Sequence, residues 1–527
     1  MTKSNNKKTY LTYSSLLIFV GLVVALLVLC GCGRKRVNRE HSNKVSEEFE
    51  YLTRRIKVHC PGELNLSRKE AEQDLDELEW LLENRYSYLR LKGVDYRAAL
   101  DSIRSSLGNG ISRGALAVQL MKFMALFGDG HSRVGDPILK WMCFGNLPFL
   151  IQESGRRQIA CQADRSDFID PNFPFLRALD GVPIDSWLRA AGQLVAQGSP
   201  QYLRYHSIRN LRYIEFLRKE LGLNDSGPIE VELESADGAR TARIELPPEK
   251  KGPAYGFWPR PEAQIRSRED IRVESRILPW NIGYLRIIAC LAEPKFLDDL
   301  VEAMNRFNDT DGLIIDIRSN GGGSRAPLRV LFPFFMAENE TPRIVNVAAY
   351  RLGVDDRKEA FEARYLHAPS WQGWSDAEQA AIKRFAAPFR PEWIPPAEAF
   401  SQWHYFVISP STDKRYYHYD EPVVILMDTW NFSACDIFLA AFKGWKNITL
   451  MGQPSGGGSG CRARYRLHNS DISLYLSSMA SFQPNGKLYD GNGIQPDVII
   501  EPIPTDFIGK TDSILQTTIQ RLQKKDG

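Results

Sequence analysis

The chain has 527 residues, of which 43% are hydrophobic and 25% are charged, and this is the composition of a globular protein rather than a disordered one. Lysine and arginine number 67 against 64 acidic residues. A net charge of +3 on this length argues against a nucleic-acid-binding protein, because phosphate contacts need clustered basic surface. One hydrophobic core seldom holds so long a chain, so we expect roughly two to four domains.

The N-terminus combines a basic start with a long apolar stretch. The opening MTKSNNKK is followed by an uncharged segment at 9–33, which is the pattern of a secretory signal. This segment ends in LVLCGCG, which resembles the cleavage box of bacterial lipoproteins and so implies cleavage before Cys32 and a lipid on its thiol. An uncleaved anchor is the alternative, since the stretch is long enough to span a bilayer. Either way, residues 1–33 would tether the chain to a membrane of the cell envelope, on the extracytoplasmic side.

Residues 34–66 are polar and charged, and we interpret them as a tether. The pattern from 67 to 130 predicts an N-terminal helical domain. Three segments, each opened by a capping residue, predict helices at 67–86, 95–107 and 112–127.

The segment 131–250 has a mixed pattern. Strands are predicted where short runs are rich in apolar and β-branched residues, at 146–153, 157–163, 228–235 and 240–247. Between them, FLRALDGVPIDSWLRAAG at 175–192 predicts a strand, a turn and a helix. The Pro- and Gly-rich segment 250–266 is typical of a linker.

Strands and helices alternate from 270 to 510, as in an α/β core. Strands are predicted at 281–287, 312–318, 422–428 and 447–452, and helices at 295–307 and 434–445. The continuous apolar run GLIIDIR is typical of a strand buried on both faces. A charged insertion at 351–405 interrupts this pattern. Its tryptophans would either line an apolar pocket or form a small core of their own, and they are Trp371, Trp374, Trp393 and Trp403.

The chain contains eight cysteines, and their spacings match no zinc motif. An oxidising compartment would permit a disulfide, but the sequence does not give the pairing. We expect most of these cysteines to be small buried apolar residues.

The segment NFSACDIFLAAF, at 431–442, begins where a predicted strand turns into a helix. Ser433 in this segment is either a nucleophile or an N-cap, and capping is the commoner use of serine. A nucleophile at this place would benefit from the free N–H groups and the positive dipole end of the helix, which stabilise an oxyanion. The N–H of Ala434 is the expected donor.

Two other segments hold candidate residues. DIRSNGGGS, at 316–324, places three glycines after a buried strand, and Gly322 is the expected second oxyanion donor, with a flexible turn as the alternative. FGDGHSRVGD places His131 in a loop after a helix. This histidine is either the base that a serine nucleophile needs or a solvated loop residue.

Together these segments resemble one family, the tail-specific or C-terminal processing serine peptidases, whose core is related to ClpP and crotonase. GLIIDIRSNGGG is similar to the family's strand and Asn-Gly-Gly loop, NFSACDIFLAAFK to its nucleophile segment, and DGNGIQPDVIIEP to its closing motif. The order and spacing of the motifs agree over nearly the whole chain after the tether. The resemblance implies that Ser433 is the nucleophile.

The family has two catalytic styles, and this sequence resembles the second. The bacterial processing proteases use serine and lysine, but Gly458 stands where the lysine would be. The tricorn protease core and the interphotoreceptor retinoid-binding protein instead have a histidine and a glutamate, which correspond to His131 and Asp490 here. The resemblance implies that His131 is the general base and that Asp490, one methylene shorter than glutamate, orients it or belongs to its polar network. Two smaller departures are Ser132 for the usual threonine and Gly130 where the tricorn core has serine.

The resemblance also implies an α/β fold class, with a ClpP/crotonase-like catalytic core at 270–510, an N-terminal helical domain at 67–130 and a PDZ-like domain at 131–250. PDZ-like domains grip peptide ends by strand addition. The implied activity is that of a cell-envelope serine-type peptidase that acts on peptides or unfolded proteins and needs no metal or other cofactor.

A catalytically silent protein that binds peptides or hydrophobic ligands on the same fold is the alternative. The features that favour it are Asp490, the missing lysine and the insertion. A cysteine hydrolase using Cys435 is disfavoured, because Cys435 is expected inside the helix and away from both oxyanion donors. The sequence gives neither the oligomeric state nor the cleavage specificity.

Overall fold

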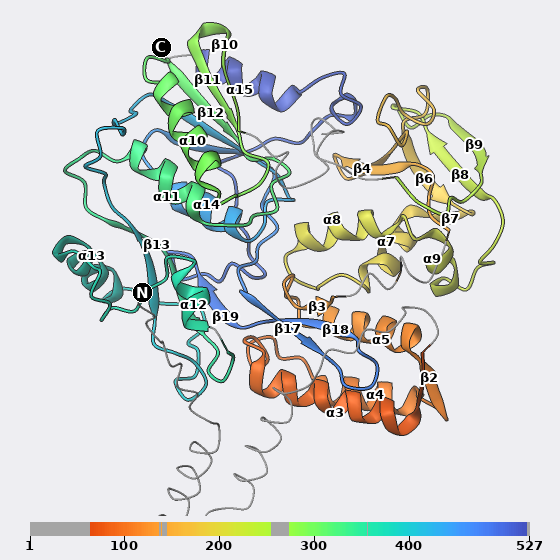
Figure 1. Ribbon diagram of the computed structural model, residues 1–527. Helices are drawn as coiled ribbons and strands as arrows, with labels where there is room; N and C mark the ends of the chain where they lie inside the picture. Colours follow the sequence, from red (N-terminus) through yellow and green to blue (C-terminus); the bar gives the residue numbers. More distant parts are fainter. Residues whose placement is uncertain (1–63, 136–138, 140–144, 254–272, 356, 524–527) are drawn as a thin grey trace, which may run out of the picture. The chain divides into compact units, whose positions relative to one another are not determined.

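A computed structural model describes residues 64–135, 139, 145–253, 273–355 and 357–523 (Figure 1). The predicted signal or anchor at 1–33, with Cys32, and most of the predicted linker at 250–266 lie outside these residues. Among the helices of the described ranges, none is both long enough and apolar enough to cross a membrane.

The three predicted N-terminal helices are confirmed. They are α3 (Arg68–Arg85), α4 (Tyr96–Ser106) and α5 (Arg113–Ala125), and their N-caps are Ser67, Asp95 and Ser112. At the start of α3 the Ser67 hydroxyl accepts the Glu70 N–H while the Glu70 carboxylate accepts the Ser67 N–H, which is a capping box. The end of the predicted tether forms a short strand, β1 (Asn65–Ser67), which pairs with β2 (Gly110–Ser112).

The next part of the chain folds around an antiparallel sheet in the order β4-β5-β6-β8-β9, with β7 paired to β6. Its strands are β4 (Leu150–Ser154), β5 (Arg157–Cys161), β6 (Phe175–Leu179), β7 (Val182–Pro183), β8 (Ile229–Glu234) and β9 (Thr241–Leu246). The helices are α7 (Ile184–Gly192), α8 (Pro200–Asn210) and α9 (Ile214–Glu220), and α8 and α9 were not predicted. The four predicted strands and the strand-turn-helix at 175–192 are confirmed, whereas the PDZ-like identity of this part stays a prediction.

A six-stranded sheet in the order β10-β11-β12-β15-β16-β20 forms the α/β core. Its strands are β10 (Glu274–Leu278), β11 (Ile282–Arg286), β12 (Gly312–Asp316), β15 (Val423–Met427), β16 (Ile448–Gly452) and β20 (Val498–Ile499). All neighbouring pairs are parallel except β10 and β11. Every residue of β12 is buried, as expected for a strand that is covered on both faces.

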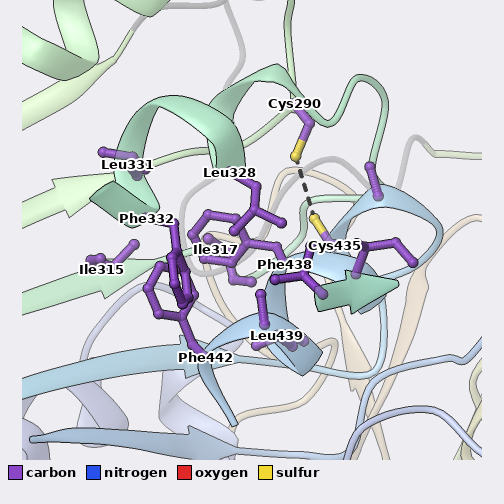
Figure 2. Packing of buried hydrophobic residues seen from close by; sticks show 14 of the residues in the cluster. Cys290, Ile315, Ile317, Leu328, Leu331, Phe332, Cys435, Phe438, Leu439 and Phe442 are labelled. Carbon is purple, nitrogen blue, oxygen red and sulfur yellow. Dashed lines mark hydrogen bonds between the residues drawn. The ribbon is translucent and has the colours of Figure 1, made fainter. Parts of the chain in front are cut away.

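Helices cover both faces of this sheet and create two cores. On one face, α10 (Pro294–Arg306), α11 (Ala326–Leu331) and α14 (Ala434–Phe442) pack on alternate residues of β12, among them Ile315. Figure 2 shows this packing around Phe332, Phe438 and Phe442. On the other face, α15 (Ser513–Gln523) packs on Ile314 and its neighbours. The carboxyl ends of the parallel strands therefore lead into loops held between two layers of helices.

Two smaller sheets complete the part of the chain that the structure describes. One has the order β14-β13-β19 and consists of β13 (Arg343–Tyr350), β14 (His404–Ile408) and β19 (Met479–Phe482). The other has the order β17-β18-β3 and consists of β17 (Arg462–Arg466), β18 (Ser473–Ser477) and β3 (Arg133–Val134). Because β3 pairs with β18 and not with β4–β9, the preceding loop with His131 is held against the C-terminal part of the chain.

The predicted insertion at 351–405 lies between the paired strands β13 and β14 and contains α12 (Arg357–Glu362) and α13 (Asp376–Ala386). Its tryptophans contact nearby aromatic rings: Trp371 contacts Trp374, Trp393 contacts Phe400, and Trp403 contacts Phe389. These contacts support the small core among the two alternatives for the tryptophans.

Candidate active site

Ser433 stands at the N-cap position of α14 in a strained backbone conformation, with φ 63° and ψ −115°. Side chains with a Cβ rarely adopt a positive φ, and such strain gathers at functional sites. The helix start is satisfied without the serine hydroxyl. The Ser433 N–H donates to the Asp436 carboxylate at 2.8 Å, and the Asp436 N–H donates to the Ser433 carbonyl at 3.0 Å. The hydroxyl instead lies 3.3 Å from His131 Nε2, so Ser433 is more than a cap.

His131 is held in place by its own loop and by the ring of Phe432, which precedes α14. Its imidazole stacks on the Phe432 ring, with centroids 4.6 Å apart. The Asp129 carboxylate accepts the His131 backbone N–H at 3.0 Å and the Ser132 hydroxyl at 2.5 Å. The Ser132 hydroxyl in turn accepts the Ser477 N–H of β18, so a serine at this position is sufficient for the contact. The expected proximity of His131 to Ser433 is present.

Asp490 is buried beside His131 but makes no recorded hydrogen bond to it. One carboxylate oxygen accepts the Tyr88 hydroxyl at 2.7 Å and the Ser459 N–H at 3.1 Å. The other oxygen, Oδ1, has no partner among the described residues. One polar atom from each of Asp129, His131 and Asp490 lies within 4.8 Å of the others. The shorter side chain thus reaches the neighbourhood of the imidazole but stops short of bonding to it.

Burial shifts the pKa values of both groups. It raises the pKa of Asp490 to about 8, and the nearby Asp129 carboxylate adds to this. Burial lowers the pKa of His131 to about 4; Asp129 opposes this change, whereas the positive charges of Arg462, Arg364 and Arg133 reinforce it. At neutral pH, His131 is therefore uncharged and able to accept a proton, and Asp490 is largely protonated.

The two predicted oxyanion donors have different surroundings. Ala434 is the first residue of α14, so its N–H is among those that have no partner within the helix. Gly322 lies next to it, since a Cβ on Gly322 would be 2.9 Å from the Ala434 nitrogen. However, the Gly322 N–H already donates to the Asn320 side-chain oxygen at 2.9 Å. The structure brings Gly322 to the site but does not leave its N–H free, because the Asn320 side chain closes a local turn.

The glycines at positions where relatives have larger residues are explained by packing. A Cβ on Gly458 would lie 2.3 Å from the Phe432 ring, and a Cβ on Gly130 would lie 2.8 Å from it. His131 and Phe432 therefore fill the space that a lysine at 458 or a serine at 130 would need. The packing of His131 and Phe432 is therefore incompatible with a lysine at position 458.

Sequence reasoning missed several residues of the site. Asp436, at the third position of α14, is buried and accepts the N–H groups of Ser433 and Gly458 and the hydroxyl of Ser455. Burial raises its pKa to about 7. Its spacing from Ser433 is that of a capping box, which would have been a usable signal. Asp129 stands inside the quoted GDGHS, whereas nothing in the sequence around Tyr88 points to the site.

Cys435 is not a nucleophile in this structure. It is fully buried, and its Sγ lies 3.7 Å from Cys290 Sγ within the core (Figure 2). Burial, followed by the contact with Cys290, raises the pKa of the thiol well above its ordinary value. A buried, protonated thiol is inert. The cysteines with described surroundings are buried and free, as expected, and are Cys161, Cys290, Cys435 and Cys461.

Ser433 and His131 open into a cavity of about 870 Å³. The wall has an apolar part, which includes Met121, Met124 and Leu194, and a basic part that holds several arginines. A cavity of this volume fits a segment of several residues of extended peptide. Among the described residues, the only His, Cys, Asp or Glu group with metal-like spacing is Asp129, His131 and Asp490, which belongs to this site.

Comparison with known proteins agrees with this geometry. The model of Peptidase family S41 matches residues 281–500. A tricorn protease homolog from Saccharolobus solfataricus is 32% identical over 91 residues, which make up 17% of this chain and 8% of that protein. The crystal structure of mature CPAF is 17% identical, with a TM-score of 0.59, and the match covers 87% of this chain and 98% of that one. The structure of mature CPAF complexed with lactacystin is 18% identical, with a TM-score of 0.58, and the match covers 87% of this chain and 99% of that one.

The family match includes the nucleophile segment and the closing motif, and the similarity of fold extends to the N-terminal helices. Residues 281–500 are therefore similar to peptidase family S41, and the chain shares the α/β fold of mature CPAF.

Proposed function

We propose that this chain hydrolyses peptide bonds through an acyl-enzyme on Ser433, with His131 as general base. The observation that carries the proposal is the 3.3 Å approach of His131 Nε2 to the hydroxyl of a strained Ser433, at the start of a buried helix and inside a large cavity. A serine that served only as a cap would turn its hydroxyl to the helix N–H groups.

The proposed reaction has two halves. Ser433 Oγ attacks the peptide carbonyl as its proton passes to His131 Nε2, and the Ala434 N–H stabilises the oxyanion that forms. His131 then returns the proton to the leaving amine as the C–N bond breaks, which leaves an ester on Ser433. Water then attacks the ester as its proton passes to His131 Nε2, and His131 returns this proton to Ser433 Oγ as the ester bond breaks. Gly322 serves as a second donor when its N–H exchanges the Asn320 side chain for the substrate oxygen.

Asp490 is proposed as a positioning residue. To accept a proton on Nε2, the neutral imidazole must carry its own proton on Nδ1. In the structure Nδ1 accepts the Gly460 N–H at 3.4 Å, so the base form requires Nδ1 to exchange this donor for an acceptor. The unpartnered Oδ1 of Asp490 is the acceptor that we assign to this proton, and an ionised Asp490 stabilises the imidazolium that forms during attack. Asp129 fixes the backbone of the histidine loop and adds negative charge behind the ring.

The proposed substrates are peptides or unfolded proteins, and the proposed location is the cell envelope, with a membrane tether at the N-terminus. The cavity volume supports the first proposal. The basic start, the uncharged segment at 9–33 and the lipoprotein-like box with Cys32 support the second.

A catalytically silent binding protein remains the second candidate, and two observations favour it. The Gly322 N–H is engaged by Asn320, and Asp490 is held by Tyr88 without a recorded bond to His131. Either arrangement lowers catalytic power without affecting the cavity as a binding site.

The test is hydrolysis of unfolded protein by the full-length chain in detergent, followed by mass spectrometry of the products. Wild type should give new termini, whereas Ser433→Ala and His131→Ala should give none. Ser105→Ala is the matched control, because Ser105 is exposed on α4 and its hydroxyl bonds only to the Asp101 carbonyl in its own helix. Lactacystin, the compound bound in a similar structure, should bind wild type and not Ser433→Ala. Folded wild type that binds peptides without cleaving them would favour the second candidate.

A further inference from the structure

Four arginines line the cavity that holds Ser433, and they are Arg133, Arg325, Arg364 and Arg462. They come from four separate segments: β3, the glycine loop before α11, the insertion after α12, and β17. Among the described residues that line the cavity, none is acidic. The basic part of the wall is therefore assembled by the fold and is not a run of charge in the sequence.

None of the four arginines has a recorded salt bridge within the described residues. Arg325, with 5% of its surface exposed, donates only to the Arg364 carbonyl, at 3.3 Å. Arg364 donates to the Ala360 carbonyl at 2.7 Å. Arg133 and Arg462 lie over the Tyr475 ring, at 5.3 and 4.6 Å from its centroid. Their contacts are with carbonyls and an aromatic face, so no carboxylate of the described residues neutralises their charges.

Two other buried arginines are paired with carboxylates. Arg318 is fully buried and binds both Asp316 and Asp512, and Arg218 binds Asp180 through two nitrogens. A buried charge without a counter-charge is costly, and a protein retains one mainly where a ligand supplies the partner. Arg325, unlike Arg318 and Arg218, has no carboxylate partner among the described residues, and it lines the cavity.

The arginines also act on the catalytic residues. Arg462, Arg364 and Arg133 each help to lower the pKa of His131, which places their charges close to the imidazole. Burial lowers the pKa of Arg325 and of Arg133, and the charges of Arg364 and Arg462, respectively, lower these pKa values further. An anion bound among the arginines would reduce both their effect on the pKa of His131 and the repulsion between them.

We propose that Arg133, Arg325, Arg364 and Arg462 form a subsite that binds a carboxylate of the peptide substrate next to the scissile bond. This inference rests on the proposed peptidase function and adds a substrate class to it. Guanidinium groups bind carboxylates with two parallel hydrogen bonds, so the cluster selects planar anions over neutral side chains. The carboxylate comes either from an acidic side chain or from the C-terminus of the substrate. The insertion at 351–405 thereby gains a role, because it supplies Arg364.

Two sets of matched peptides test the proposal and separate the two sources. In the first set, glutamate or glutamine is placed in turn at the two positions on each side of a cleaved bond. In the second set, the same bond lies near a C-terminal acid or a C-terminal amide. The wild-type ratio of kcat/KM, acid over neutral, should be about tenfold or more in one of the sets, as for a hydrogen bond to a charged group.

Arg462→Gln and Arg364→Gln should reduce that ratio severalfold each, and the double variant should bring it close to one. Arg464→Gln is the matched control, because it removes an arginine from the same strand that also faces Tyr475 but does not line the cavity. Added salt should lower the ratio in wild type and leave it unchanged in the double variant.

Peptide binding to Ser433→Ala, measured by titration calorimetry, repeats the comparison without catalysis. Tighter binding of the acidic peptide, lost when Arg364→Gln and Arg462→Gln are added, would support the subsite even if wild type cleaves nothing. The binding measurement therefore distinguishes failure of the subsite from failure of the peptidase proposal. A ratio near one in both peptide sets, in cleavage and in binding, would overturn the subsite. So would a preference that Arg464→Gln reduces as much as the double variant does.

Discussion

The Tyr88 hydroxyl donates a 2.7 Å hydrogen bond to the Asp490 carboxylate, although the two residues are 402 positions apart. Tyr88 follows the helix α3 in the N-terminal part, and Asp490 precedes the closing motif of the catalytic core. Burial raises the pKa of the Tyr88 hydroxyl well above its ordinary value, so it stays a donor at any physiological pH. The N-terminal helices therefore take part in the site through both His131 and the support of Asp490.

Replacing Tyr88 with phenylalanine should weaken catalysis at neutral pH. The hydroxyl stabilises the ionised form of Asp490, so its loss raises the pKa of Asp490 further above 8. One unit of pKa lowers the ionised fraction tenfold, so kcat/KM at pH 7 should fall roughly fivefold to tenfold. Peptide hydrolysis measures this, with Tyr96→Phe as control, because Tyr96 donates to Glu83 away from the site. Equal activity of Tyr88→Phe and wild type at pH 7 would argue against a supporting role.

The pH profile of kcat/KM should fall in two steps as pH decreases. Asp490, with a pKa raised to about 8, loses its charge first, and the rate falls in part because the imidazolium loses its partner. His131, with a pKa lowered to about 4, stays a neutral base until much lower pH, where the remaining activity disappears. The steps belong to a coupled cluster and are read as apparent values. A single step near pH 6.5 would contradict this assignment.

Removing one of the nearby arginines should move the lower step. Positive charge disfavours the imidazolium, so Arg462→Gln should raise the apparent pKa of the lower step and leave the upper step in place. The expected change is a few tenths of a unit, roughly what a partly exposed charge produces. The pH profile of kcat/KM for Arg462→Gln measures this change, and the profile of Arg464→Gln is the control. An unchanged lower step would mean that Arg462 does not act on the ring.

Asp490→Asn should separate the charge of Asp490 from its shape. Above pH 8, where wild type is ionised, the variant should lose about a hundredfold or more in kcat/KM, as when an orienting carboxylate is removed from a histidine. Near pH 6 the two proteins should differ little, because wild type is then protonated too. The ratio of the two pH profiles gives the answer. A constant ratio across this range would show that the ionisation of Asp490 is irrelevant to catalysis.

Gly458→Ala should disturb His131 although it adds one carbon. The new Cβ would lie 2.3 Å from the Phe432 ring and 3.1 Å from His131 Nδ1, so the ring stack would have to shift. Such a shift at the base is expected to cost about a hundredfold in rate. Gly312→Ala tests for a general glycine effect, because Gly312 has no positive φ and a Cβ there would meet its nearest atoms at 3.4–3.5 Å, an ordinary contact. Full activity of Gly458→Ala would mean that the stack is not needed.

Local signals in the sequence predicted the first helices and the central parallel strands of the core. The capping residues Ser67, Asp95 and Ser112 marked helix starts correctly, and the continuous run GLIIDIR marked a strand covered on both faces. These features depend on residues a few positions apart, so they can be read without knowing the fold. Helix α8 was missed because it buries only Ser207 and Ile208, and α9 was missed because seven residues are too short to show a helical pattern.

The site was only partly predictable. Ser433, His131 and Asp490 came from motifs, and the structure places all three together. Tyr88 and the four arginines gave no signal, because they reach the cavity only through the folding of distant segments. The engagement of Gly322 by Asn320 was also beyond the sequence, because residue identity does not fix the direction in which a peptide N–H points.

The most direct test of the account is covalent labelling of the full-length protein with a fluorophosphonate probe, with the modified peptide identified by mass spectrometry. The account predicts a label on Ser433 that is lost in Ser433→Ala and in His131→Ala and kept in Cys435→Ala, because Cys435 is buried against Cys290. Folded wild type that takes no label, or a label on any residue other than Ser433, would contradict the assignment of Ser433 as the activated nucleophile.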